Sequence, residues 1–192
     1  MTEKFAKAIR VVTTAPVFAA ILTTLLYLLL PDGFASFQHY LAALGCLVVL
    51  PLLAYPVSYA VPCLRKKGRD AQRTLAVIFS VIGYIAGFLI GVLCGGTATE
   101  KVLFGTYLIS GIGIALCTAL RFKASGHACG CSGPIAMLAV FASPWFLTGY
   151  MLLAPVVWAS KRLGRHSAVQ MLVGAVIPVV AMLLCRIALI SL

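Results

Sequence analysis

The chain consists of long apolar runs separated by short segments rich in Lys and Arg. Each run approaches the roughly 20 apolar residues that a helix needs to cross the hydrocarbon core of a membrane. In lipid, helices satisfy their own backbone hydrogen bonds, so runs of this length predict helices. The sequence is 62% hydrophobic, whereas soluble domains have about 45–50% apolar residues. We therefore expect an all-α, polytopic transmembrane bundle in which residues 1–192 form a single integral membrane domain. The apolar runs are 11–30, 38–62, 74–94, 102–120 and 168–190.

Residues 128–159 do not fit this pattern, because the segment is long for one level crossing and short for two. Ser143, Pro144 and Trp145 lie in its middle, and a proline there favours a break. If the segment is one crossing, the basic residues 161–165 move to the opposite membrane face. A hairpin of two short helices instead gathers the basic segments on one face. We prefer the hairpin, which gives six to seven membrane helices including a short hairpin at 128–159.

The hairpin places all but Lys101 and Arg186 of the 15 Lys and Arg residues on one face. The positive-inside rule makes this face cytoplasmic, and we expect an integral protein of a prokaryotic cell membrane. The net charge is +11. Because the basic residues lie between apolar runs, we expect them to set the membrane topology, to contact anionic lipid headgroups or to bind phosphate. We do not expect a nucleic acid partner.

Glycine and cysteine are both frequent in the apolar runs. Gly83, Gly87 and Gly91 recur at every fourth position, which predicts a helix face that packs closely on its neighbours. The seven cysteines are scattered and odd in number, which argues against a disulfide framework. Cys129 and Cys131 are spaced too closely for an ordinary zinc site, so we expect no metal and no other cofactor.

Three polar stretches share the basic face of the predicted hairpin topology: 66–73, 125–127 and 160–170. They carry two histidines and several cations, a combination that suits a phosphoryl group. Arginine binds phosphate oxygens in a bidentate manner, and the N–H groups at a helix start add anion affinity. One histidine can attack phosphorus, and the other can protonate the leaving oxygen.

In order and spacing, these stretches resemble the motifs of the type 2 phosphatidic acid phosphatase superfamily of membrane lipid phosphatases. The resemblance covers a phosphatase-like core of about residues 62–178. The first motif matches at Lys66 and Arg73, with Thr74 where the family has Pro. The second is Ser125-Gly126-His127, preceded by Ala124 where the family has Pro. In the third, around His166, Ser160 stands where the family has Arg and Gln170 where it has Asp.

The resemblance implies that His166 is the nucleophile forming a phosphohistidine and that His127 is the general acid. It also implies phosphate binding by Lys66, Arg73, Ser125 and Gly126. From spacing alone, Arg162 lies four residues before His166 and can share its helical face, so it can replace the missing motif arginine. Gln170 can support the His166 ring as a hydrogen-bond acceptor, although it lacks the charge of a carboxylate.

These features predict a membrane phosphatase that acts on a lipid phosphate or a (poly)prenyl diphosphate, with this substrate and membrane lipids as partners. A second hypothesis keeps the fold without the chemistry, so that the protein binds or transports a lipid phosphate. A third is a small transporter unrelated to phosphatases. The charge count favours a cytoplasmic site, whereas the resembled family acts on the outer or luminal face, so both orientations stay open.

Overall fold

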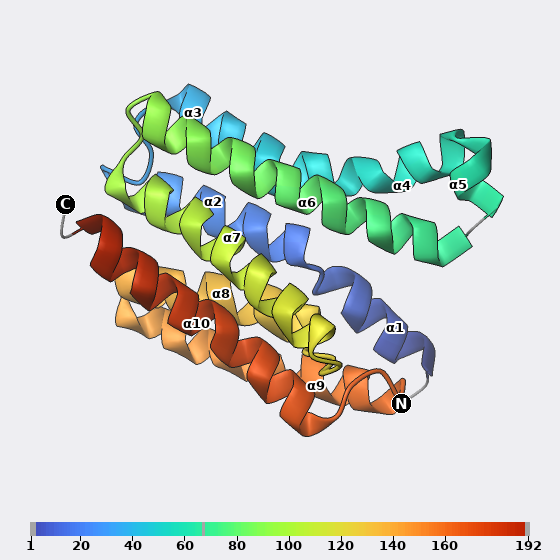
Figure 1. The fold of residues 1–192 in the computed structure, drawn as a ribbon. Coiled ribbons are helices and arrows are strands. Elements are labelled where there is room, and N and C mark those ends of the chain that lie inside the picture. The colour runs from blue at the N-terminus through green and yellow to red at the C-terminus, as the bar shows by residue number, and fades with distance from the viewer. Residues whose placement is uncertain (1–2, 67, 191–192) are drawn as a thin grey trace.

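The computed structural model describes residues 3–66 and 68–190, and this part of the chain contains helices and connecting turns without a strand (Figure 1). The predicted all-α class is confirmed. The elements are α1 (Glu3–Val12), α2 (Ala15–Leu29), α3 (Phe37–Leu44), the π-helical turn η1 (Gly45–Val49), α4 (Leu50–Ala60), α5 (Pro62–Lys66), α6 (Gly68–Leu93), α7 (Ala98–Ala119), α8 (Gly126–Phe141), the 3₁₀ helix η2 (Pro144–Leu152), α9 (Leu153–Arg162) and α10 (Ala168–Ile190).

Four helical stretches in the described chain are long and apolar enough to cross a membrane: 37–60, 71–93, 98–119 and 168–189. A fifth is present if α1 and α2, which meet at a bend of 40°, form one crossing. The bend has a local cause, because Pro16 lies at the start of α2 and proline favours the first positions of a helix. The chain is thus a membrane protein by helix length and composition, and six to seven crossings stay a prediction.

Close packing at glycines holds α6 against its neighbours. A Cβ atom at Gly83 would collide with the carbonyl of Cys46 in η1, and one at Gly87 would collide with the ring of Phe104 in α7. Both positions belong to the glycine stripe. The predicted packing role of this stripe is therefore confirmed at these two contacts, where small residues let helices approach closely.

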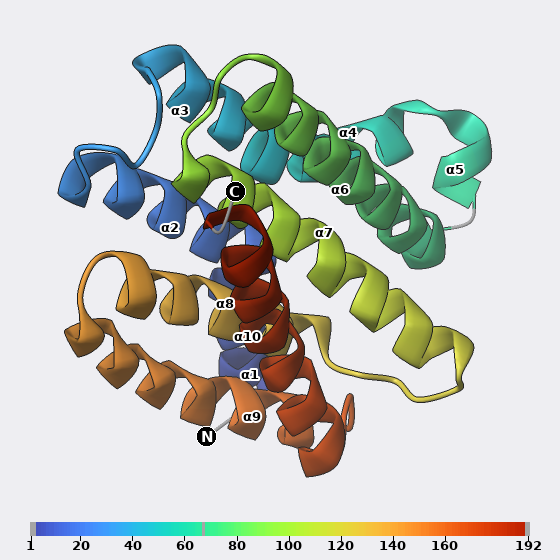
Figure 2. The same ribbon diagram turned by 60° about the vertical axis from the view of Figure 1, so that its left-hand side comes forward.

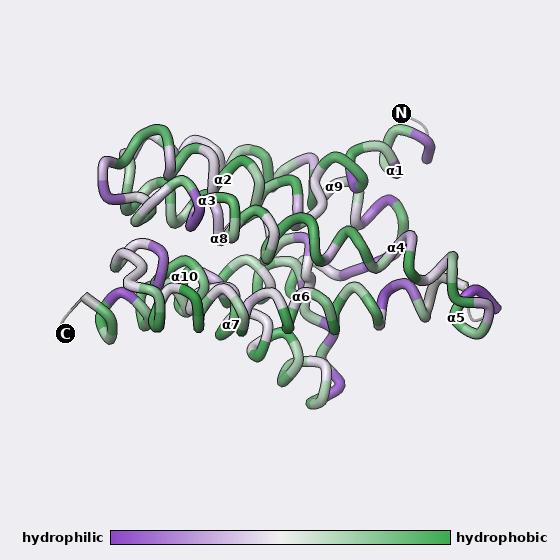
Figure 3. Tube along the Cα trace, turned by 90° about the horizontal axis from the view of Figure 1, so that it is seen from above, coloured by the Kyte–Doolittle hydropathy of each residue, from purple (hydrophilic) through white to green (hydrophobic). Residues whose placement is uncertain are grey.

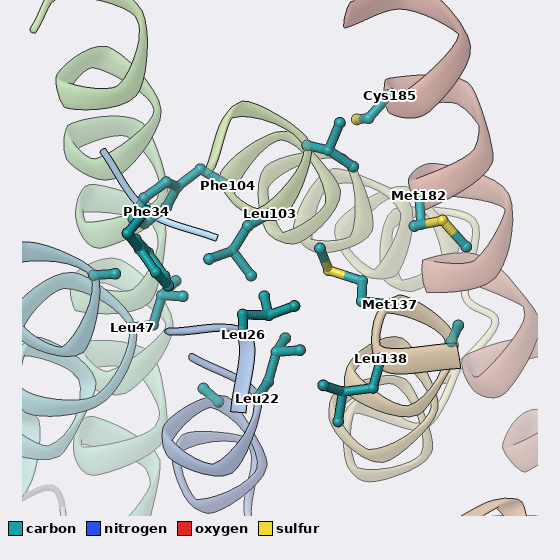
Figure 4. Close-up of a cluster of buried hydrophobic side chains, with 14 residues drawn as sticks. Leu22, Leu26, Phe34, Leu47, Leu103, Phe104, Met137, Leu138, Met182 and Cys185 are labelled. Carbon is teal, nitrogen blue, oxygen red and sulfur yellow. The ribbon is translucent and has the colours of Figure 1, made fainter. Parts of the chain in front are cut away.

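The core lies between α2, α7, α8 and α10 (Figure 4). Leu22 and Leu26 of α2 pack with Leu103, Met137 and Met182, and none of these five side chains is more than 1% exposed. Exposed apolar side chains also lie on the outside of the bundle, among them Val77, Leu116 and Leu172. Figure 3 shows that hydrophobic residues make up most of the Cα trace of the helices. An apolar exterior around a packed interior is the arrangement that suits a lipid environment.

Residues 128–159 fold back as predicted. Helix α8 ends at Phe141, the Ser143 hydroxyl accepts the Trp145 N–H at the start of η2, and η2 with α9 returns beside α8 (Figure 2). The end of α9 therefore lies near the start of α8. We call this end of the bundle, where α1, α8, α9 and α10 meet, the basic end.

Candidate functional site

His127 and His166 lie together at the basic end. His127 belongs to the first turn of α8, whose N-cap residue Ser125 accepts the Ala128 N–H at 3.3 Å. His166 lies in the connection between α9 and α10. His166 Nδ1 lies 3.1 Å from the carbonyl oxygen of Lys123, four residues before His127, and the Ser125 N–H donates to the carbonyl of Gln170, four residues after His166, so the backbone brings the two histidines to the same end of the bundle. The hairpin thus joins histidines that are far apart in sequence.

Hydrogen bonds fix the tautomer of each neutral ring. The His166 Nδ1–H donates to the carbonyl oxygen of Lys123 at 3.1 Å, which makes Nε2 the unprotonated nitrogen of the neutral ring. The His127 Nε2–H donates to the carbonyl oxygen of Arg10 at 3.0 Å, which leaves Nδ1 as the acceptor. His166 therefore presents an unprotonated nitrogen of the kind that a nucleophile needs.

Burial and neighbouring cations keep both rings neutral at neutral pH. Burial is the main cause that lowers the pKa of His166, and the charges of Lys123 and Arg10 lower it further, against the hydrogen bonds to Lys123 and Gln170. His127 lies one residue before the predicted hairpin at 128–159. Burial is also the main cause that lowers the pKa of His127, and the charges of Arg10 and His166 lower it further. An anion bound among these groups would reverse the electrostatic part of both shifts.

Arg10 is the central cation of the site, and the sequence motifs do not include it. Its Nη1 donates to the Ser160 hydroxyl of α9 at 3.3 Å, while its carbonyl accepts from His127. Helix α1 packs along α9, and the rings of Phe5 and Trp158 meet at 6.1 Å between their centroids. The available signal in the sequence was the run of basic residues Lys4, Lys7 and Arg10 in α1, but membrane topology was sufficient to explain it.

No ion pair among the described side chains joins the cations around Arg10 to a carboxylate. The positive charges of Arg165 and Arg73 act on the Arg10 guanidinium, and the charge of Lys123 acts on His166. The ion pairs in the described part of the chain are Lys7–Glu3 and His39–Glu100, so none of these four cations is neutralised there. Such a concentration of positive charge favours an anionic ligand.

Ser125 and Gln170 hold the site together through the backbone. The Ser125 N–H donates to the Gln170 carbonyl at 3.0 Å, and a Cβ at Gly174 would collide with the Ser125 backbone, so α10 packs tightly on the start of α8. The Gln170 side chain interacts with the His166 ring and accepts the Ser167 N–H at 3.1 Å, while Ser167 accepts from Gln170. This reciprocal pair is a capping box.

The remaining predicted residues are Gly126, which directly precedes His127, and the cations Lys66, Arg73 and Arg162. Gly126 is exposed at the start of α8, with open space around it. Arg162 is exposed and is the last residue of α9, whereas His166 lies in the connection after it. The prediction that Arg162 and His166 share a helical face is therefore wrong. Lys66 is exposed at the end of α5, which packs on α4 and α6. Among the predicted cations Lys66, Arg73 and Arg162, the described electrostatic interactions connect Arg73 to Arg10.

A second polar cluster lies at the opposite end of the bundle and was not predicted. The Glu100 side chain is 1% exposed, and its Oε2 lies 2.6 Å from His39 Nδ1. Its Oε1 accepts the N–H groups of Ala35 and Thr97. This carboxylate therefore joins α3, α7 and the turn before α3, which is a structural role.

No protein-family profile, curated protein or solved structure matches this chain. Among the described residues, no group of three or more His, Cys, Asp or Glu side chains is placed to hold a metal ion. The site at the basic end is instead made of cations and two neutral imidazoles. Cations beside an unprotonated imidazole nitrogen are groups of the kind that suit an oxyanion.

Proposed function

We propose that this protein is a membrane-embedded phosphatase that hydrolyses a lipid phosphate or a (poly)prenyl diphosphate through a phosphohistidine intermediate. The observation that carries the proposal is that hydrogen bonds hold His166 on the Lys123 carbonyl and His127 on the Arg10 carbonyl, at the end of the bundle where the Arg10 guanidinium also reaches Ser160. The motif resemblance in residues 62–178 supports the same chemistry. In this proposal the two arms at 128–159 also cross the membrane, which gives the predicted six to seven crossings.

The proposed reaction has two steps, phosphoryl transfer to His166 and hydrolysis of the phosphohistidine. The His166 Nε2 lone pair forms a bond to phosphorus as the bond from phosphorus to the lipid oxygen breaks, and a protonated His127 gives its proton to that oxygen. The oxygen of a water molecule then forms a bond to phosphorus as the bond from phosphorus to His166 Nε2 breaks, His127 takes the proton of that water, and inorganic phosphate leaves. The negative substrate favours protonation of His127, whose charge is disfavoured in the free protein.

Two residues take over roles for which the resembled motif uses other side chains. Arg10 brings its guanidinium to Ser160, the position at which the family has arginine. The Lys123 carbonyl holds His166 Nδ1–H, the proton that the family aspartate would hold. A carbonyl orients the ring as a carboxylate does but stabilises a cationic ring less, so we expect slow turnover.

The test is phosphate release by purified protein in nanodiscs that contain phosphatidate, phosphatidylglycerol phosphate or a polyprenyl diphosphate. We expect release of inorganic phosphate that is lost in His166→Ala, and an acid-labile phosphoryl label on the wild-type protein. Lys161→Ala is the matched control, because Lys161 is an exposed cation on α9 outside the proposed machinery. Release that persists in His166→Ala would contradict the phosphohistidine step.

One observation favours a second candidate function. The group that accepts the His166 Nδ1–H is an uncharged carbonyl, and Gln170 stands where the resembled motif has Asp. The site therefore has the features of an anion-binding site without a full catalytic triad. The protein would then bind or move a lipid phosphate. Binding of vanadate and lipid phosphate without phosphate release from any of the three substrates would favour this function.

A further inference from the structure

Three buried hydroxyl groups that have no hydrogen-bond partner lie close together in the sequence of α7. They belong to Thr106, Tyr107 and Ser110, and in the described part of the chain no other buried side-chain nitrogen or oxygen lacks a partner. The Thr106 and Ser110 side chains are only 2% and 5% exposed, so bulk solvent does not reach them. A hydroxyl that is buried without a partner costs free energy. Their concentration in one place therefore indicates a partner from outside the chain.

The hydroxyls of Thr106 and Ser110 differ from those of other helical Ser and Thr residues in this chain. Such hydroxyls can donate to the carbonyl four positions earlier in the helix, as those of Thr23 and Ser80 do at 2.9 and 2.8 Å. Thr106 and Ser110 make no such bond. Their hydroxyls are therefore available to groups outside the backbone of α7.

These two hydroxyls face the seam where α7 meets α8 and α10. At about 100° per residue, Thr106 and Ser110 lie roughly 40° apart around the axis of α7, so they share a face. Thr106 interacts with the thiol of Cys185 in α10, and Ser110 with the thiol of Cys129 in α8. A Cβ atom at Gly105 would lie 2.9 Å from the Cys185 sulfur, so α10 packs closely at this level. Because a thiol is a weak donor and a weak acceptor, neither hydroxyl is satisfied there.

The seam lies in the middle of the membrane-length stretch 98–119. At 1.5 Å per residue, Thr106 and Ser110 lie about 12 and 18 Å from the start of α7. The hydrocarbon core of a membrane offers no hydrogen-bonding solvent at this depth. Residues four apart on one helix have Cβ atoms about 5–6 Å apart, and a water molecule bridges such a separation with two hydrogen bonds of about 2.8 Å. Buried water typically occupies sites of this kind, between buried polar groups that are otherwise unsatisfied.

We propose that an internal water molecule lies between α7, α8 and α10 and bridges the hydroxyls of Thr106 and Ser110. The two thiols that face the seam are its further, weaker partners. The water provides a polar link from α7 to the two helices that carry His127 and Gln170. The inference goes beyond the proposed function and does not depend on it, because it uses none of the residues assigned to the reaction.

The sign of a stability change tests this water site. Without the water, Thr106→Val would remove an unsatisfied group and raise the melting temperature. With the water, the variant removes one of its partners. We expect Thr106→Val and Ser110→Ala each to lower the melting temperature of the protein in nanodiscs by about 2–4 °C. The double variant should lose less than the sum of the two single losses, because either substitution already weakens the shared water.

Thr118→Val is the matched control for these variants. Its hydroxyl is exposed on the same helix and donates to the carbonyl of Ile114 at 2.9 Å, so the melting temperature should change little. A higher melting temperature in both Thr106→Val and Ser110→Ala would overturn the proposal. Strictly additive losses in the double variant would contradict a shared water.

Solid-state NMR measures the water contact directly in the wild-type chain, labelled with ¹³C at threonine and serine in lipid bilayers. Magnetisation transferred from water should reach the Thr106 and Ser110 side chains several-fold faster than that of Thr23. Thr23 is the reference because it is 0% exposed and its hydroxyl is bonded within its own helix. Ser110→Ala should slow the transfer to Thr106. Transfer to Thr106 and Ser110 that is no faster than transfer to Thr23 would show that the seam is dry.

Discussion

Removal of the Arg10 guanidinium tests the site most directly, because Arg10 contacts both of its halves. Its side chain donates to Ser160 on α9, and its backbone carbonyl accepts from His127 on α8. Arg10→Ala deletes the guanidinium and keeps the carbonyl. The variant therefore separates anion binding from the positioning of His127.

The expected loss follows from the contact and its exposure. A hydrogen bond to a charged group contributes about 1.5–3 kcal/mol, which is equivalent to roughly tenfold to a hundredfold in affinity. Because Arg10 is half-buried, solvent screening places the loss at the lower end. We expect Arg10→Ala to weaken vanadate binding about tenfold, and Arg10→Lys to weaken it less, since it keeps the charge without the bidentate geometry.

The assay is isothermal titration of vanadate, a mimic of the phosphoryl transition state, into the protein in nanodiscs. Ser160→Arg in the Arg10→Ala background returns a guanidinium to the same place, so it should recover binding. Lys4→Ala removes an exposed charge from the same helix and is the control for bulk electrostatics. Unchanged affinity in Arg10→Ala, or an equal loss in Lys4→Ala, would refute the reasoning.

Three further predictions concern protonation and packing. Vanadate binding should take up protons and strengthen as pH falls below neutrality, because the free protein lowers the pKa of His127 and an anion raises it. Titration in buffers of different ionisation enthalpy measures this uptake, and proton release would contradict it. Glu100→Ala should lower the free energy of unfolding by about 3–5 kcal/mol without changing vanadate affinity, since Glu100 lies at the far end; thermal unfolding with and without vanadate separates the two effects. Gly83→Ala should lower the free energy of unfolding by about 1–3 kcal/mol, because the added Cβ collides with the Cys46 carbonyl. Gly45→Ala, whose Cβ meets no atom, should raise the free energy of unfolding by up to about 1 kcal/mol. Equal melting temperatures for the two variants would show that the glycine stripe is not closely packed.

The helical fold was predictable because apolar runs of membrane length leave the backbone few alternatives. The fold-back at 128–159 was also predictable, since proline marked its break and charge fixed the side to which it returned. The bend between α1 and α2 was not predicted. The run 11–30 has the hydropathy of one helix, whereas Thr13 and Thr14 separate two helices.

The site was predicted only where its residues lie in recognisable local patterns. His127 and His166 were found because each stands in a polar stretch beside an apolar run. Arg10 was missed because its contacts are with residues 117 and 150 positions away, and no periodicity encodes such a distance. Glu100 follows Thr97 in a capping-box spacing, which indicates a helix start and says nothing of a buried partner in another helix.

The contacts of Arg10 also set an order of assembly. Helix α1 is the first described element to be synthesised, and Ser160, the partner of Arg10, lies 150 positions later. The complete anion site therefore forms only when α1 packs on α9. A ligand that binds the finished site must then strengthen the docking of α1. Proteolysis in the 13–14 hinge, slowed by vanadate, would report site completion without any measurement of catalysis.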